Sequence, residues 1–243
     1  RLKDTLGRSA LCVGSLWRCG FAYLRPLPSR ASRGDICVDS DGGLMADSNL
    51  TPSDDKHLIE TTVSSQTVYR GHFLELRRDE VALPDGAVAA REYVIHPGAV
   101  MIVAVLPDGR LVMERQYRYP VRQTMIEFPA GKLDAGEGGL ACAQRELWEE
   151  TGYKARRWAK AGVMHPVIGY ATEVIEIWFA QDLTLGERHL DAGEFLDVFA
   201  ASQDELESWM QAGQLTDAKT IVGMMWLQRW RAGHCQLAWQ TVA

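Results

Sequence analysis

The sequence predicts an α/β fold in which a mixed β-sheet lies between helices. Three observations predict this fold class. Apolar and polar residues alternate with a period of two over residues 67–95, which is typical of strands. A continuous apolar run over 99–106 predicts a strand buried on both faces. Strands then alternate with helical segments without regular βαβ repetition, which favours a mixed sheet.

Strands are predicted where alternation or a short apolar run is bounded by turn residues. Thr67–Val81 and Val88–Ile95 flank the Pro-Asp-Gly turn at 84–86, and this pattern predicts a hairpin. A second Pro-Asp-Gly turn follows the buried strand, at 107–109. Further strands are predicted at Leu111–Gln116, Thr124–Phe128, Arg157–Met164, Glu173–Ala180 and Phe195–Ala200.

Three helices are predicted in the second half of the chain. Gly131–Gly139 is a loop rich in Gly and Asp, and helix-forming residues dominate from its end to Thr151. Gly152 occupies the position at which a helix commonly ends. The other two helices are predicted at Ser202–Gln211 and from Asp217 to about Arg231, with Thr216 or Asp217 as the N-cap of the last one.

The composition of the 243 residues is that of a globular protein. Hydrophobic residues make up 47% and charged residues 24%, and no run approaches the roughly 20 apolar residues of a membrane helix. A net charge of −6 argues against a nucleic-acid-binding surface. The five cysteines show no spacing typical of a zinc site or a disulfide framework, so we expect a cytoplasmic protein.

The beginning of the chain differs from the rest. Residues 1–44 are rich in Arg, Ser, Gly and Cys and show no sustained periodicity. We expect residues 1–53 to be a leader or an extension with little order. A targeting peptide is the alternative, because Ser and Arg are enriched in transit sequences.

The predicted helix that ends at Thr151 carries three glutamates, Glu146, Glu149 and Glu150. At about 100° per residue, all three project within about a quarter of the helix circumference. Such crowding is unfavourable unless a cation offsets the charge, and oxygen ligands of this kind favour Mg²⁺ or Mn²⁺ over zinc. A solvated charged face is the alternative, with Arg145 as its one basic partner on this helix.

The spacing around these glutamates resembles the Nudix box. The motif runs Gly131-x5-Glu137-x7-Arg145-Glu146-Leu147-x-Glu149-Glu150-x-Gly152. The resemblance implies the Nudix fold, an α/β/α sandwich with a mixed sheet. It also implies hydrolysis of a nucleoside diphosphate linked to another group, with Mg²⁺, or alternatively Mn²⁺, as the cofactor. Two or more such ions neutralise a diphosphate and acidify an attacking water.

The same resemblance implies a role for each residue of the box. Glu146 and Glu150 would be the principal metal ligands, and Glu149 a further ligand or a catalytic group near the metal. Arg145 and Glu137 would orient these ligands. Gly131 would permit the close approach of loop to helix, and Gly152 completes the fixed positions.

Two further segments look like the ADP-ribose pyrophosphatase subfamily of Nudix hydrolases. They are Gln116-Tyr117-Arg118-Tyr119-Pro120 and Glu127-Phe128-Pro129-Ala130-Gly131-Lys132-Leu133-Asp134. The resemblance implies that Arg118 contacts the substrate, that Glu127 lies at the site and that the Ala130 carbonyl completes the coordination of a metal. Arginine suits this role because its paired donors match a diphosphate.

The strands before residue 97 are similar to the small antiparallel β domain of that subfamily. We therefore expect an N-terminal β domain over 54–97, which forms a homodimer, and a Nudix domain over 98–243. Arg77 is a candidate for substrate binding. The other candidates are Tyr69, Phe73, Arg78 and Arg91. Alternatively, each of these residues, like Arg77, is an ordinary strand residue without a role in binding.

The general base is expected on the loop at 186–194, as often in this subfamily. That loop offers Glu187, Asp191 and Glu194, and the resemblance favours Glu194. Closure of such a loop over the substrate would assemble the site and exclude water. A solvated loop acid is the alternative.

The predicted activity is metal-dependent hydrolysis of ADP-ribose or a related ADP-sugar, giving AMP and a sugar phosphate. One stretch departs from the subfamily, because Ile168 precedes Gly169 where a proline is usual. GDP-mannose or another nucleoside diphosphate sugar therefore stays open as the substrate. A triphosphate hydrolase and an inactive nucleotide-sensing Nudix domain are the remaining alternatives.

Overall fold

The computed structural model describes residues 55–242. The leader predicted over 1–53 lies outside the described residues, as does Asp54, the first residue of the predicted β domain. In the described part, no helix combines the length and the apolar character needed to cross a membrane.

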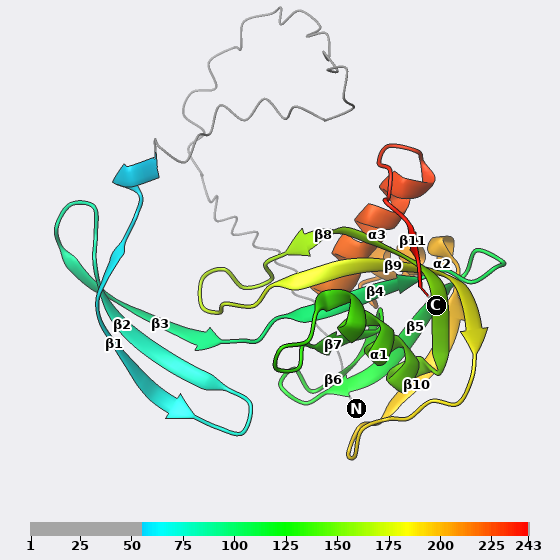
Figure 1. Cartoon of the computed structure of the whole chain (residues 1–243), viewed down its shortest axis with the longest axis horizontal. Helices are drawn as coiled ribbons and strands as arrows, with labels where there is room; N and C mark the ends of the chain where they lie inside the picture. The colour runs from blue at the N-terminus through cyan, green and yellow to red at the C-terminus, as the bar shows by residue number, and fades with distance from the viewer. Residues whose placement is uncertain (1–54, 243) are drawn as a thin grey trace, which may run out of the picture. The chain divides into compact units, whose positions relative to one another are not determined.

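The described chain begins with a short 3-10 helix, η1 (Asp55–His57), followed by an antiparallel sheet in the order β1-β2-β3 (Figure 1). Its strands are β1 (Thr61–Arg70), β2 (Glu75–Ala82) and β3 (Val88–Ile95). The prediction of β3 is confirmed. The prediction of one strand over Thr67–Val81 is wrong, because a turn divides it and the Gly71 N–H donates to the Leu74 carbonyl at 2.8 Å.

A five-stranded mixed sheet forms the centre of the remaining chain, in the order β11-β8-β9-β4-β7. Only β4 and β9 pair in parallel, and their neighbours in the sheet are antiparallel. This arrangement confirms the mixed sheet. The strands are β4 (Ala99–Ala104), β7 (Ala130–Lys132), β8 (Tyr153–Met164), β9 (Ile175–Leu185) and β11 (Gln240–Thr241).

A second, three-stranded antiparallel sheet has the order β10-β5-β6. Its strands are β5 (Leu111–Arg118), β6 (Gln123–Glu127) and β10 (Leu196–Ala201). The predicted strands of this sheet agree with the structure to within two residues at each end. The chain returns from β6 through β7 directly to α1 (Gly139–Thr151), and this path brings the site residues of β5, β6, β7 and α1 together.

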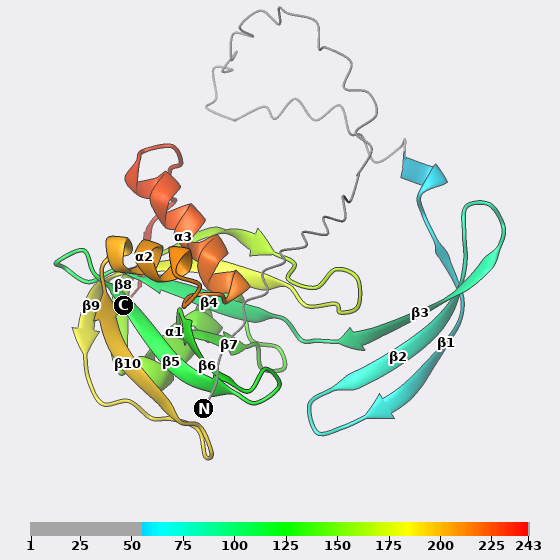
Figure 2. The same ribbon diagram turned by 180° about the vertical axis from the view of Figure 1, so that it is seen from behind.

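Helices cover both faces of the five-stranded sheet. Alternate residues of β4 face opposite sides: Val100 and Ile102 pack in the cluster with α1, while Met101 and Val103 pack in the cluster with α2 (Gln203–Gln211) and α3 (Ala218–Arg231). Figure 1 shows α1 in front of the sheet, and Figure 2, from behind, shows α2 and α3 in front. The predicted α/β/α sandwich is confirmed.

The ends of the helices follow from local sequence. Gly152 ends α1 with a φ of 76°, in the left-handed region that glycine adopts without strain. Ser202 and Glu205 form a capping box at the start of α2. Of the two residues proposed as the N-cap of the last helix, the structure selects Asp217, whose side chain accepts a hydrogen bond from the Thr220 N–H.

Candidate active site

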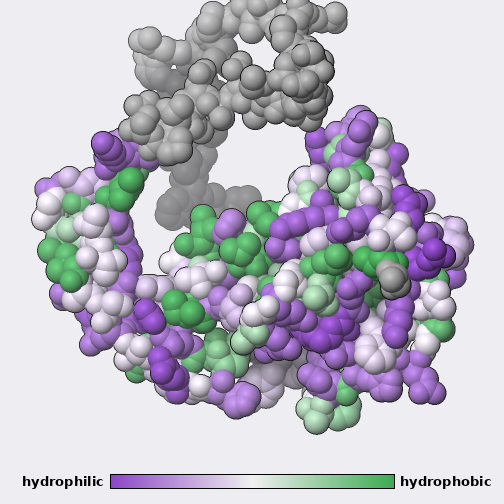
Figure 3. Space-filling view, in the orientation of Figure 1, coloured by the Kyte–Doolittle hydropathy of each residue, from purple (hydrophilic) through white to green (hydrophobic). Residues whose placement is uncertain are grey.

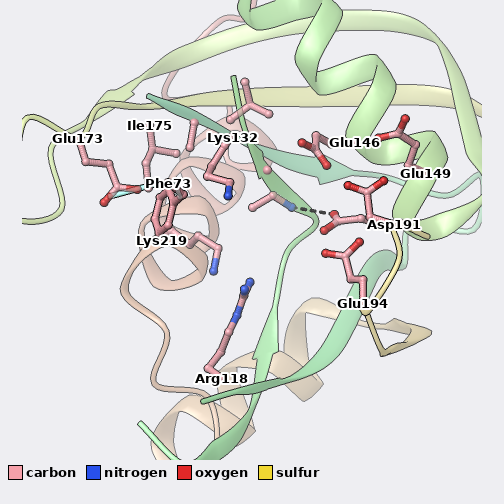
Figure 4. Close-up of a pocket in the computed structure, with 15 residues that line it drawn as sticks. Phe73, Arg118, Lys132, Glu146, Glu149, Glu173, Ile175, Asp191, Glu194 and Lys219 are labelled. Atoms are coloured by element: carbon pink, nitrogen blue, oxygen red, sulfur yellow. Dashed lines mark hydrogen bonds between the residues drawn. The ribbon is translucent and has the colours of Figure 1, made fainter. Parts of the chain in front are cut away.

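A cavity of about 480 Å³ lies where α1, β4, β5, β7 and the loop after β9 meet (Figure 4). Most of its acidic side chains lie together on one side, whereas Glu173 lies apart from them, next to Phe73 (Figure 4). The acidic residues are Glu146, Glu149, Glu150, Glu173, Asp191 and Glu194, and the basic residues are Arg118, Lys132 and Lys219. Apart from Glu173, the acidic side chains thus lie on one side of the cavity, as expected of a site for a metal ion.

Glu150 is the most deeply buried of the three glutamates on α1, with 3% of its surface exposed. Its Oε2 accepts a hydrogen bond from the Ala130 N–H at 3.1 Å, drawn as the dashed line in Figure 4. Burial and the neighbouring charges of Glu114 and Glu146 raise its pKa well above the ordinary value. Burial likewise raises the pKa of Glu146 to about 7, although Arg145 opposes the shift.

Glu114 on β5 belongs to the same group of carboxylates. Only 3% of its surface is exposed, and within residues 55–242 its Oε1 has no hydrogen-bond partner. Burial, together with repulsion from Glu127, raises its pKa to about 8. The sequence analysis did not select Glu114. It could have been recognised as an acidic residue that directly follows three apolar residues of a predicted strand.

These carboxylates have the chemistry of a site for a divalent cation. Buried acids that repel one another, and an orphaned oxygen on Glu114, are stabilised when a hard cation binds them. Among residues 55–242, no three acidic, His or Cys side chains are already arranged around one point. The chemistry of the donor set fits a metal ion, and the side chains would have to move to converge on it.

Arg145 connects the residues of the box. Its guanidinium donates to Glu137 at 2.7 and 2.9 Å, to Glu146 at 2.8 Å and to Glu149 at 3.1 Å. The hydrogen bonds from Arg145 lower the pKa of Glu137 to about 2, so this carboxylate stays ionised. One cation thus holds three acids in fixed positions at the edge of the cavity.

Gly131 lies in strand β7 and not in the predicted loop, and it faces the side chain of Glu146 on α1. A Cβ atom at this position would lie 1.8 Å from Cδ of Glu146, far inside any allowed contact. Any larger residue here would displace the Glu146 carboxylate. The close approach predicted for Gly131 is therefore present in the structure.

Arg118 and Glu127 form a bidentate pair opposite the carboxylates, with N–O distances of 2.7 and 2.9 Å. Lys219 of α3 donates to the same carboxylate and to Asp217 at 3.0 Å. Sequence analysis did not select Lys219, because a lysine in the first turn of a helix is usually a surface residue. The fold instead turns it into the cavity.

The loop between β9 and β10 is fastened to the C-terminal end of α1. The His189 N–H donates to the Glu149 carbonyl at 3.0 Å, and the His189 ring meets Trp148 edge-on at 5.0 Å. This anchoring brings Asp191 and Glu194 to the cavity, facing the glutamates of α1 (Figure 4). Glu187, the third acid of the loop, is not among the residues that line the cavity.

Two residues singled out by sequence lie away from this cavity. Arg77 on β2 pairs with Glu75 at 2.8 Å and does not line the cavity within one chain. Ile168, at the departure from the subfamily, is 84% exposed and does not line it either. That stretch supports the end of β3 instead, where the Val94 N–H donates to the Tyr170 carbonyl.

Comparisons with known proteins agree with this geometry. Residues 95–222 match the NUDIX domain, and residues 60–94 match the nucleoside diphosphate sugar hydrolase N-terminal domain. The chain is 36% identical over 175 residues to the ADP-ribose pyrophosphatase of Bacillus subtilis (strain 168), covering 71% of this chain and 95% of that protein.

Two further relatives extend the comparison. The methanol dehydrogenase activator of Bacillus methanolicus is 36% identical over 173 residues, which cover 70% of this chain and 92% of that protein. A crystal structure of an ADP compounds hydrolase superimposes with a TM-score of 0.66 at 23% identity, covering 73% of this chain and 97% of that one. This last likeness concerns the fold alone.

The family match covers more than half of the 243 residues and contains all the carboxylates of the cavity. Nudix hydrolases generally use a divalent metal ion, which fits the buried acids described above. The chain therefore belongs to the Nudix hydrolase family and carries the N-terminal domain of the nucleoside diphosphate sugar hydrolases.

Proposed function

We propose that this protein hydrolyses the diphosphate bond of ADP-ribose or a related ADP-sugar. Water adds across the P–O–P bond, and AMP and a sugar phosphate leave. The observation that carries the proposal is the cavity itself, in which the carboxylates of α1 face the Arg118–Glu127 pair. The names of relatives, such as the ADP-ribose pyrophosphatase of Bacillus subtilis, support this substrate class.

The metal ligands in this proposal are Glu146 and Glu150, with Glu149 and the Ala130 carbonyl as further contacts. Mg²⁺ is the ion we favour and Mn²⁺ the alternative, because every ligand is an oxygen. When bound, the metal neutralises the diphosphate and acidifies the attacking water. Arg145 and Glu137 hold the ligands in place, supported by their hydrogen bonds of 2.7 and 2.9 Å.

Arg118 is proposed to bind the diphosphate, and Glu127 to fix the orientation of its guanidinium. A pre-oriented arginine loses little freedom when it binds an anion. Glu194 is proposed as the general base that accepts the proton of the attacking water, and Asp191 is the alternative on the same loop. The position of both acids on the cavity wall supports this assignment.

A homodimer is proposed through the N-terminal β domain, residues 54–97. All ten residues of β1 are exposed within one chain, and Val63, Val68 and Tyr69 are each more than half exposed. Figure 3 shows apolar surface in this part of the molecule. In such a dimer, Arg77 would bind substrate in the cavity of the partner subunit. A cytoplasmic location is also proposed, supported by the free thiols of Cys142 and Cys235.

A substrate panel with Mg²⁺ tests the proposal. It contains ADP-ribose, another ADP-sugar, GDP-mannose and a nucleoside triphosphate, with products identified by chromatography. We expect ADP-ribose to give AMP and ribose 5-phosphate, and EDTA to abolish turnover. If GDP-mannose is hydrolysed in preference to ADP-ribose, GDP-mannose becomes the proposed substrate. If none of the compounds is hydrolysed in a metal-dependent reaction, the assignment as an enzyme is wrong.

A further inference from the structure

Lys132 is the last residue of β7 and one of the three cations of the cavity. Its backbone is held on the opposite side, where its carbonyl accepts hydrogen bonds from Arg145 Nη2 at 3.1 Å and Cys142 Sγ at 3.3 Å. The β7–β4 pairing fixes it further, opposite Ala99. Because the main chain is fixed, the direction of the side chain into the cavity is set by the fold (Figure 4).

The three cations differ in their partners. Arg118 is paired with Glu127, and Lys219 is paired with Glu127 and Asp217. Lys132 makes no ion pair with any residue between 55 and 242, although several carboxylates line the same cavity. Its ammonium group lies instead over the ring of Phe73, 4.3 Å from the ring centroid.

A contact between an ammonium and a half-exposed phenylalanine ring is weak, and phenylalanine is a poorer partner than tryptophan. A phosphate oxygen is a much stronger partner, because the hydrogen bond then joins two opposite charges. Lysine serves as a compact point charge in phosphate sites. The cavity thus contains one cation that forms no ion pair with a carboxylate of residues 55–242.

Phe73 indicates which part of the substrate lies beside Lys132. It is the only aromatic residue among the described residues that line the cavity, and an aromatic face suits a nucleobase by stacking. It belongs to the turn between β1 and β2, away from the carboxylates of α1 (Figure 4). A nucleotide whose base contacts Phe73 would bring its 5′-phosphate towards Lys132.

We propose that Lys132 binds the phosphate of the nucleotide half of the substrate, the phosphate that leaves as AMP. The proposal rests on the function proposed above. On binding, the ammonium exchanges its contact with Phe73 for the phosphate, and the ring face becomes available to the base. Lys132 would then contact the nucleotide half of the substrate and not the sugar phosphate half. The carboxylates of α1 would hold the metal ion on the opposite side of the cavity.

Calorimetric binding of AMP and adenosine in the presence of Mg²⁺ tests the proposal. The wild type is expected to bind AMP at least about tenfold more tightly than adenosine, since a charge-assisted hydrogen bond contributes at least that much. Lys132→Met should lose most of this difference, and Lys132→Arg should keep it. Unchanged adenosine binding in each variant shows that the cavity is intact.

Lys154→Met is the matched control. The ammonium of Lys154 also lies over an aromatic ring, 4.4 Å from the centroid of Trp148, but Lys154 does not line this cavity. This variant is expected to bind AMP as the wild type does. Equal AMP affinities in Lys132→Met and Lys154→Met would overturn the proposal, as would a wild type that binds AMP no better than adenosine.

Kinetics with ADP-ribose give a second measurement. Lys132→Met should raise KM about tenfold and change kcat by less than about threefold, because a contact present in both ground and transition states affects binding alone. If the wild type fails to hydrolyse ADP-ribose but the AMP difference still depends on Lys132, the proposed function is wrong and the phosphate contact stands. If the wild type hydrolyses ADP-ribose but its preference for AMP over adenosine does not depend on Lys132, only the role proposed for Lys132 is wrong and the proposed function stands.

Discussion

The strands β1 and β4 are opposite extremes of the molecule. All ten residues of β1 are exposed, whereas all six residues of β4 are buried between helices. Among the described residues, every buried hydrophobic side chain except Val81 lies from β4 onwards, whereas the N-terminal sheet leaves apolar side chains such as Val68 in solvent. This difference supports the proposal that the N-terminal sheet serves in assembly, while the core of the fold lies from β4 onwards.

The largest effect is expected for catalysis, which takes place in the region from β4 onwards. Glu194→Gln should lower kcat by roughly 10²–10⁴-fold, because the proposed general base is removed while the proposed metal ligands remain. Steady-state kinetics over a range of Mg²⁺ concentrations would measure this, with the metal concentration at half-maximal activity unchanged. The proposed dimer should persist in this variant, which separates the effect on catalysis from an effect on assembly.

Asp191→Asn is the matched variant on the same loop. A near-normal kcat for Glu194→Gln together with a large loss for Asp191→Asn would move the role of base to Asp191. Losses of equal size in both variants would contradict the assignment of a single base.

A smaller effect is expected for folding. Ile102→Ala should lower the free energy of unfolding by about 2–5 kcal/mol, because it leaves a cavity in a strand that is packed on both faces. Val68→Ala should change it by less than about 0.5 kcal/mol in the monomer, since Val68 is 54% exposed. Urea denaturation at low protein concentration measures both, and equal losses would contradict the comparison.

The smallest effect on a single chain, and the clearest on assembly, is expected for Val68→Asp. A buried, unpaired carboxylate is unfavourable in an apolar interface, so the proposed dimer should dissociate while the monomer remains folded. Light scattering coupled to gel filtration measures the mass, and Gln66→Asp on the same strand is the control. A wild type that is monomeric at all concentrations would refute the dimer itself.

Sequence patterns located most strands from β4 onwards and failed at two places in the N-terminal sheet. The first strand begins at Thr61 and not at the predicted Thr67, and a turn divides the predicted strand. Alternation continues through Arg70 and Glu75, so the turn between β1 and β2 was not distinguished from a longer strand. The short strands β7 and β11 were not predicted either, because two or three residues carry no periodicity. Their pairing partners, β4 and β8, are distant in the sequence.

The candidate site was predictable where spacing along one element determines geometry. Glu146, Glu149 and Glu150 share a helix, so their common direction follows from its period. Glu114 and Lys219 come from β5 and α3, and the pairing partner of Lys219, Glu127, is 92 residues away. Such contacts depend on tertiary packing, which local patterns do not encode.

The sequence by itself determined the α/β fold class, the carboxylate helix and its register with Gly131 and Gly152. These features depend on helical period, local backbone conformation and a motif of fixed spacing. Tertiary structure decided which charges remain without partners. It paired Arg118 with Glu127, buried Glu114 and left Lys132 facing Phe73, because burial and charge pairing depend on the distances between elements.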